Sequence, residues 1–161
     1  MTKHLRLRAV ALVVANPAGE ILVLQETVNK PHIGKYQGMW SIPMETCETG
    51  GSYLSTLRQL HEEELGGLLS IQMPARRIGA YRVAPNIWAQ LHATTSSTYH
   101  LPSVFGDESE VRNHQWVPVQ EAIGLWLRRG ALEMIRDYAG GREDVLRRRC
   151  SEVRTQEFVR T

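Results

Sequence analysis

Two apolar segments near the N-terminus limit the possible folds more than any other feature of the sequence. Residues 5–15, LRLRAVALVVA, pass from alternating charged and apolar residues into a continuous apolar run, and residues 21–26, ILVLQE, form a second run. The turn-forming stretch NPAGE lies between them, so the pair is predicted to form a β-hairpin. Continuous apolar runs are typical of strands that are covered on both faces. These strands therefore need further layers above and below them.

The rest of the chain supplies helices for those layers. Ser52 is a good N-cap for a helix that continues to about Leu65, and Gly66 is a suitable residue to end it. The other predicted elements are strands at 38–43, about 70–83, about 86–97 and 114–119, loops at 27–37, 45–51 and 101–110, and helices at about 119–130 and 131–140. This order indicates an α+β or α/β/α layered domain with a mixed sheet.

Composition places the chain among soluble globular proteins. It has 161 residues, 42% of them hydrophobic and 22% charged, which suits one domain over residues 1–161. No apolar run approaches the ~18 residues that a membrane span needs. The two cysteines, Cys47 and Cys150, match no metal-ligand spacing and are interpreted as free thiols. We therefore expect a cytoplasmic protein that does not bind membranes.

Charge is unevenly distributed along the chain. The net charge of +2 gives no general argument for nucleic-acid binding, but residues 128–161 hold nine arginines against six acids. The Arg-rich part from about residue 142, with Arg147–Arg149 at its centre, is interpreted as a solvated helix or tail. Phosphate or nucleic-acid binding is the less favoured reading of this segment, and no nucleic-acid partner is expected.

One stretch gives the clearest indication of a chemical function. It covers residues 38–67 and reads GMWSIPMETCETGGSYLSTLRQLHEEELGG. It resembles a degenerate form of the Nudix box, G-x5-E-x7-R-E-U-x-E-E-x-G-U with U a bulky aliphatic residue. The W-x-I-P strand, the E-x-G loop that begins at Glu48 and the glutamates before Gly66 carry this resemblance. Flanking segments extend it over about residues 5–140. It implies a Nudix-type α/β/α sandwich with a mixed sheet.

Two alignments of the box are possible, and neither is complete. An alignment without a gap from Pro43 puts Gly51 at the loop glutamate, Gln59 at the arginine and Leu60 at the first helix glutamate. An alignment anchored on Arg58 needs a one-residue deletion before the helix and puts Gln59 at that first glutamate. The paired glutamates are Glu63 and Glu64 in the first alignment, and Glu62 and Glu63 in the second.

Helical geometry favours Glu63 as the best single metal ligand. At about 100° per residue, Tyr53, Leu57 and Leu60 share one apolar face, and Glu63 falls on its flank. A metal ligand should lie where the core meets a cleft, and a flank satisfies this condition. His61, near the apolar edge, is interpreted as a structural residue.

The resemblance implies hydrolysis of a nucleoside diphosphate derivative by water attack at phosphorus. Mg²⁺ or Mn²⁺ would neutralise the developing negative charge, and hard cations prefer oxygen ligands. The implied roles are metal binding by Glu48, Glu62, Glu63 and Glu64, catalysis by Glu63, orientation by Arg58, a general base at Glu110, and substrate contacts from Lys35 and Tyr36. The partner would be a nucleotide-derived small molecule, and a homodimer is possible. The alternatives are an inactive nucleotide-binding or regulatory module and, less favoured, a protein–protein interaction domain.

Overall fold

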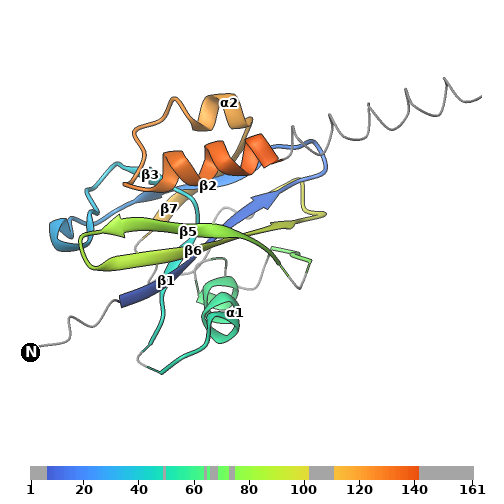
Figure 1. Cartoon of the computed structure of the whole chain (residues 1–161). Helices are drawn as coiled ribbons and strands as arrows, with labels where there is room; N and C mark the ends of the chain where they lie inside the picture. Colours follow the sequence, from blue (N-terminus) through green and yellow to red (C-terminus); the bar gives the residue numbers. More distant parts are fainter. Residues whose placement is uncertain are drawn as a thin grey trace, which may run out of the picture.

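The computed structural model describes residues 7–48, 50–63, 65, 69–72, 75–101 and 111–141, with only the backbone described for Leu7 and Glu63. A mixed sheet forms the middle layer, with α1 on one face and the C-terminal helix on the other (Figure 1). Its strands are β1 (Leu7–Ala15), β2 (Ile21–Glu26), β3 (Trp40–Ser41), β4 (Met44–Thr46), β5 (Arg76–Ala84), β6 (Ile87–Thr95) and β7 (Val111–Val117). The helices are η1 (Pro31–Ile33), α1 (Tyr53–Glu63), α2 (Val119–Ala122) and the C-terminal helix, described over 131–141.

Strand β1 is the centre of the sheet. It pairs in parallel with β6 along its whole length, and the strand order is β3-β2-β1-β6-β5, with β4 paired to β1 and β7 paired to β2. Odd-numbered residues of β1 pack in the cluster that contains Met134, Ile135 and Tyr138 of the C-terminal helix. Even-numbered residues pack in the cluster that contains Leu57 and Leu60 of α1. This arrangement confirms the predicted α/β/α sandwich with a mixed sheet.

The predicted hairpin at the N-terminus is present but short. Strands β1 and β2 are antiparallel and pair at Ala15 and Ile21, while the other half of the same edge of β1 pairs with β4, where Ala9 lies opposite Thr46. The prediction of a loop over 45–51 was therefore wrong for its first two residues. Without β4, the backbone N–H and C=O groups on this edge of β1 would be buried and unpaired.

The predicted helix at about 119–130 is also shorter than expected. It ends at Ala122, and the following chain returns to the sheet beside β3. There the Trp40 N–H donates to the Trp126 carbonyl (2.7 Å), and the Arg128 N–H donates to the Trp40 carbonyl (2.8 Å). These long-range hydrogen bonds replace the local ones that a continued helix would have made. The following helix agrees with its prediction at 131–140.

The long hairpin β5–β6 begins later than predicted, at Arg76 rather than at residue 70. Residues 70–72 form an irregular segment in which the Gln72 N–H donates to the Thr95 carbonyl (3.0 Å). The hairpin is joined to the C-terminal helix by Tyr81, whose hydroxyl donates to the Asp137 carboxylate (2.5 Å). Burial, together with this neighbouring carboxylate, raises the pKa of Tyr81 well above its ordinary value of 10.0. None of the described helices is long and apolar enough to cross a membrane.

A buried polar pair lies on the α1 face of β6. The His92 Nε2–H donates to the Gln90 side-chain carbonyl (2.7 Å), and both residues are buried. Burial lowers the pKa of His92 below its ordinary 6.5. A hydrogen bond with the Ala75 backbone opposes this effect in part, and the charge of Arg77 adds a smaller lowering. The folded protein therefore holds this ring in its neutral form.

We expect this histidine to make the protein less stable in mild acid. Because the pKa of His92 is lowered in the fold, the unfolded chain binds the proton more readily, and stability falls as the pH drops below 6.5. A His92→Gln variant should lose less of its Tm than the wild type between about pH 7.5 and about pH 5.5. Thermal denaturation at both pH values measures the difference. An equal loss of Tm in both proteins would show that His92 is not the titrating group.

Candidate functional site

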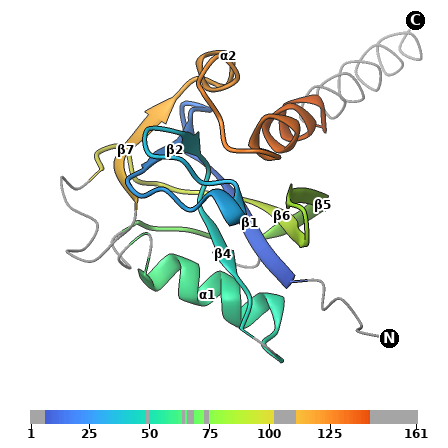
Figure 2. The same ribbon diagram turned by 90° about the vertical axis from the view of Figure 1, so that its left-hand side faces the viewer.

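Helix α1 has a capped start and one buried face. The Ser52 hydroxyl accepts a hydrogen bond from the Ser55 N–H (3.1 Å), which confirms Ser52 as the N-cap residue. Leu57 and Leu60 pack onto the sheet, and Leu60 has no exposed surface. The loop before the helix and the acidic end of the helix are thus held at fixed places on one face of the sheet (Figure 2).

The two sides of α1 beside this buried face differ. At the start of the buried face itself, the guanidinium of Arg8 lies over the Tyr53 ring, 5.2 Å from its centroid. On one side of this face, the His61 Nε2–H donates to the Leu69 carbonyl (2.7 Å), which agrees with a structural role for this histidine. Position 63 is about 200° further round the helix from His61, so it lies on the other side. Gln59, half-buried, precedes it there by one turn.

The loop before α1 forms a tight turn. The Gly51 N–H donates to the Glu48 carbonyl (2.8 Å), and Gly50 has a φ of +80°, a value that glycine adopts without strain. A Cβ atom at Gly51 would lie 3.1 Å from the Glu48 carbonyl oxygen, so the turn itself favours glycine there. The Arg8 Nη2 also donates to the Gly51 carbonyl (3.2 Å), which ties the loop to β1.

The predicted metal-site residues lie around this helix, and only part of the set is described. Arg58 and Glu62 are exposed on α1, and Glu48 is exposed in the loop. Glu63 is the last residue of α1 and its side chain is not described, while Glu64 and Glu110 lie outside the described residues. Among the side chains that are described, no three of His, Cys, Asp or Glu are grouped closely enough to hold a metal ion.

The two predicted substrate contacts lie in the loop after β2. The ammonium group of Lys35 is 3.8 Å from the carboxylate of Glu26, and both side chains are largely buried. Tyr36, the next residue, has 44% of its surface exposed. Glu26 was not among the predicted site residues. Its position as an acid at the end of the apolar run ILVLQE could have indicated that it needs a partner. Lys35 therefore serves this ion pair, and Tyr36 is the more accessible of the two.

Comparison with known proteins identifies relatives of this fold. The family model described as NUDIX domain matches residues 5–138. No curated protein matches the chain. Among solved structures, a MutT protein from Methanosarcina mazei Go1 has a TM-score of 0.63 and 16% identity, over 84% of this chain and 94% of that chain.

Two other solved structures with a similar fold were determined as complexes. The NUDIX domain of Shewanella oneidensis NrtR, complexed with ADP ribose, has a TM-score of 0.60 and 15% identity, over 87% of this chain and 88% of that chain. The C-terminal domain of mouse MUTYH, in complex with human PCNA, has a TM-score of 0.62 and 16% identity, over 85% of this chain and 90% of that chain.

Proposed function

The chain belongs to the NUDIX domain family, and we propose that it is a divalent-metal-dependent pyrophosphohydrolase acting on a nucleoside diphosphate derivative. One observation carries the proposal: the family match covers residues 5–138 and includes a capped, core-packed α1 that ends in Glu62 and Glu63. The family generally consists of hydrolases that use divalent metals. The chain is proposed to act as one domain, and the Arg-rich part from about residue 142 lies outside the described residues.

The burial of Leu60 supports the alignment of the box anchored on Arg58. In that alignment Leu60 takes the bulky aliphatic position, which suits a side chain enclosed in the core between α1 and the sheet. The alternative would put the first helix glutamate at this enclosed position, where a carboxylate could reach neither solvent nor a metal. We therefore assign Glu62 and Glu63 as the paired glutamates and Gln59 as the residue one turn earlier.

Mg²⁺ or Mn²⁺ would be held by oxygen atoms of Glu62 and Glu63, with the Gln59 carbonyl oxygen and Glu48 as further candidates. When bound, the metal would supply positive charge for the phosphate oxygens and orient the attacking water. Arg58 is proposed to hold a loop carboxylate in place, and Glu110 is proposed to act as the general base. Glu64 would be one of the paired glutamates only in the alignment without a gap. Tyr36 and Lys35 remain the proposed substrate contacts. A homodimer and a cytoplasmic location are proposed as well.

A second candidate function is nucleotide binding without turnover. In the assigned alignment Gln59 is neutral where the family pattern has a carboxylate, so this metal site has fewer negative ligands. The NUDIX domain of NrtR was solved with ADP ribose bound, which makes ADP-ribose a suitable first ligand for such a test.

A metal titration distinguishes the two functions. We expect release of phosphate-containing products from a panel of nucleoside diphosphate derivatives, including ADP-ribose, only when Mg²⁺ or Mn²⁺ is present. Removal of the metal with EDTA should stop the reaction, and adding Mg²⁺ back should restore it. Binding of a panel member without any metal-dependent product would support the binding module and contradict the enzyme.

A further inference from the structure

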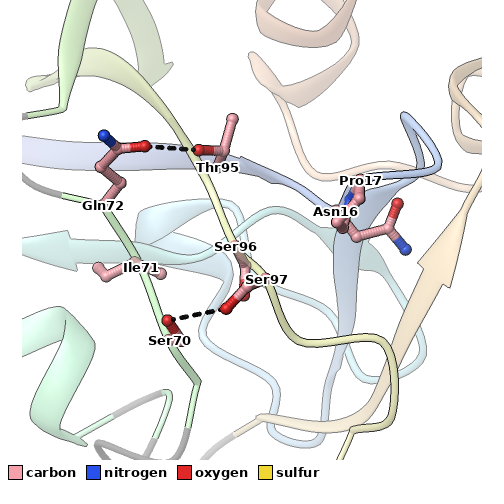
Figure 3. Close-up of a pocket in the computed structure, with 8 residues that line it drawn as sticks. All are labelled: Asn16, Pro17, Ser70, Ile71, Gln72, Thr95, Ser96 and Ser97. Carbon is pink, nitrogen blue, oxygen red and sulfur yellow. Dashed lines mark hydrogen bonds between the residues drawn. The ribbon is translucent and has the colours of Figure 1, made fainter.

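A cavity of about 500 Å³ opens at the end of the sheet where β1 and β6 finish (Figure 3). Asn16 and Pro17 line it from the turn after β1, and residues 95–97 line it from the end of β6. Residues 70–72, which follow α1 in the chain, line it directly beside residues 95–97. This volume lies within the range of ~300–1,000 Å³ that is usual for small-ligand sites.

Hydrogen bonds fix the walls of this cavity. The Ser96 N–H donates to the Ala15 carbonyl (2.8 Å), and this bond holds the end of β6 beside the turn after β1. The Gln72 carbonyl accepts a hydrogen bond from the Thr94 hydroxyl, and the Ser70 N–H donates to the Thr98 hydroxyl (3.3 Å). Residues 70–72 are therefore joined to β6 and to the residues after it. A site with walls fixed in this way loses little entropy when a ligand binds.

The polar groups in the cavity are hydroxyls and a carboxamide. The Ser97 hydroxyl donates to the Ser70 hydroxyl (3.3 Å), and the Thr95 hydroxyl donates to the Gln72 side-chain carbonyl (3.3 Å). Figure 3 shows that both pairs connect residues 70–72 with residues 95–97. Each pair combines donors and acceptors, since a hydroxyl has one proton and two lone pairs and the carboxamide adds two N–H donors. Ile71 also lines the cavity, and its side chain packs against the core cluster that contains Leu57 and Leu60.

Charge excludes several classes of ligand. The described residues that line the cavity include no charged side chain. Asn16 donates through its Nδ2 to the Glu20 carboxylate (3.1 Å), so the neighbouring charge is negative. Among the described lining residues, a phosphate group would meet no cation and a metal ion would meet no carboxylate. The ligand that matches alternating donors and acceptors beside small apolar surfaces is an uncharged molecule with several hydroxyl groups.

We propose that this cavity is a binding site for an uncharged, polyhydroxylated ligand such as a monosaccharide. It is separate from the acidic side of α1, because its wall begins at Ser70, next to the Leu69 carbonyl that His61 contacts. Position 63 lies on the other side of that helix. The proposal does not depend on hydrolysis, so a chain without enzymatic activity would still bind the ligand.

Titration of the ¹⁵N-labelled full chain with D-ribose, followed by NMR, tests the proposal. We expect saturable shifts of the backbone amide signals of Ser70, Gln72 and Ser97. The same titration with inorganic phosphate should leave these signals in place. A Thr95→Val variant keeps the shape of the side chain but removes its hydroxyl, and it should weaken ribose binding about five-fold, the worth of one hydrogen bond.

A matched control is available on the same sheet. Thr46→Val makes the same chemical change at an exposed position in β4 outside the cavity, and it should not alter ribose binding. Ser97→Trp, also at an exposed position, should fill the cavity and abolish the shifts at Ser70 and Gln72. The proposal is overturned if ribose leaves these signals unmoved, if it binds the Ser97→Trp variant as well as the wild type, or if phosphate moves them equally.

Discussion

Substitution of Glu63 by glutamine should lower metal-dependent hydrolysis by at least about 100-fold and leave the Tm unchanged. Glutamine keeps the size of the side chain and one carbonyl oxygen but removes the negative charge that a hard cation prefers. Glu63 is the last residue of α1, after the core contacts of Leu57 and Leu60, so we expect the substitution to leave these contacts in place. The Mg²⁺ concentration for half-maximal activity should rise together with the loss of kcat.

The matched control for this variant is Glu133→Gln, which makes the same change in the C-terminal helix on the opposite face of the sheet. It should retain wild-type hydrolysis and wild-type metal dependence. Thermal denaturation of all three proteins shows whether a loss of activity reflects the site or the fold. If Glu63→Gln hydrolyses the substrate as fast as Glu133→Gln does, the assignment of Glu63 to the metal site is wrong.

The sequence predicted those parts of the fold that depend on local pattern. The apolar runs of β1 and β2, the Ser52 cap and the apolar face of α1 all follow from the spacing of residues within one element. β4 could not be predicted in this way, because residues 44–46 become a strand by completing the hydrogen bonds of β1, a partner more than 30 positions away. The same reason explains why the chain leaves its helix after Ala122 and returns to Trp40.

The sequence predicted the helix that carries the candidate site. It did not predict the hydrogen bonds and ion pairs that the individual side chains make. The helix was predicted from its Ser52 cap and its apolar spacing, and the hydrogen bond of His61 to the Leu69 carbonyl agrees with the structural role predicted for it. The pairing of Lys35 with Glu26 depends on how the loop after β2 folds back over that strand, which no local pattern encodes. The cavity beyond β6 combines residues from three separate segments that consist mainly of small or polar residues. In the sequence, each of these segments resembles an ordinary turn or loop.

Introducing a glutamate at position 59 or at position 60 should have opposite consequences. Gln59→Glu adds a carboxylate one turn before Glu63 at a half-buried position, and it should lower the Mg²⁺ concentration for half-maximal activity by about ten-fold. Leu60→Glu places the same side chain where no surface is exposed, among the apolar residues between α1 and the sheet. A buried carboxylate without a partner should destabilise the protein by at least about 3 kcal/mol, which corresponds to a fall in Tm of roughly 10 °C.

This pair of variants distinguishes the two alignments of the box, because each alignment names one of the two positions as that of the missing carboxylate. Metal-dependent hydrolysis and thermal denaturation should be measured on both, together with Leu60→Met, which keeps the apolar volume and should cost less than about 1.5 kcal/mol. The alignment anchored on Arg58 requires tighter metal binding in Gln59→Glu alone. If Leu60→Glu instead folds with a wild-type Tm and binds Mg²⁺ more tightly, position 60 faces the metal and the alignment without a gap is correct.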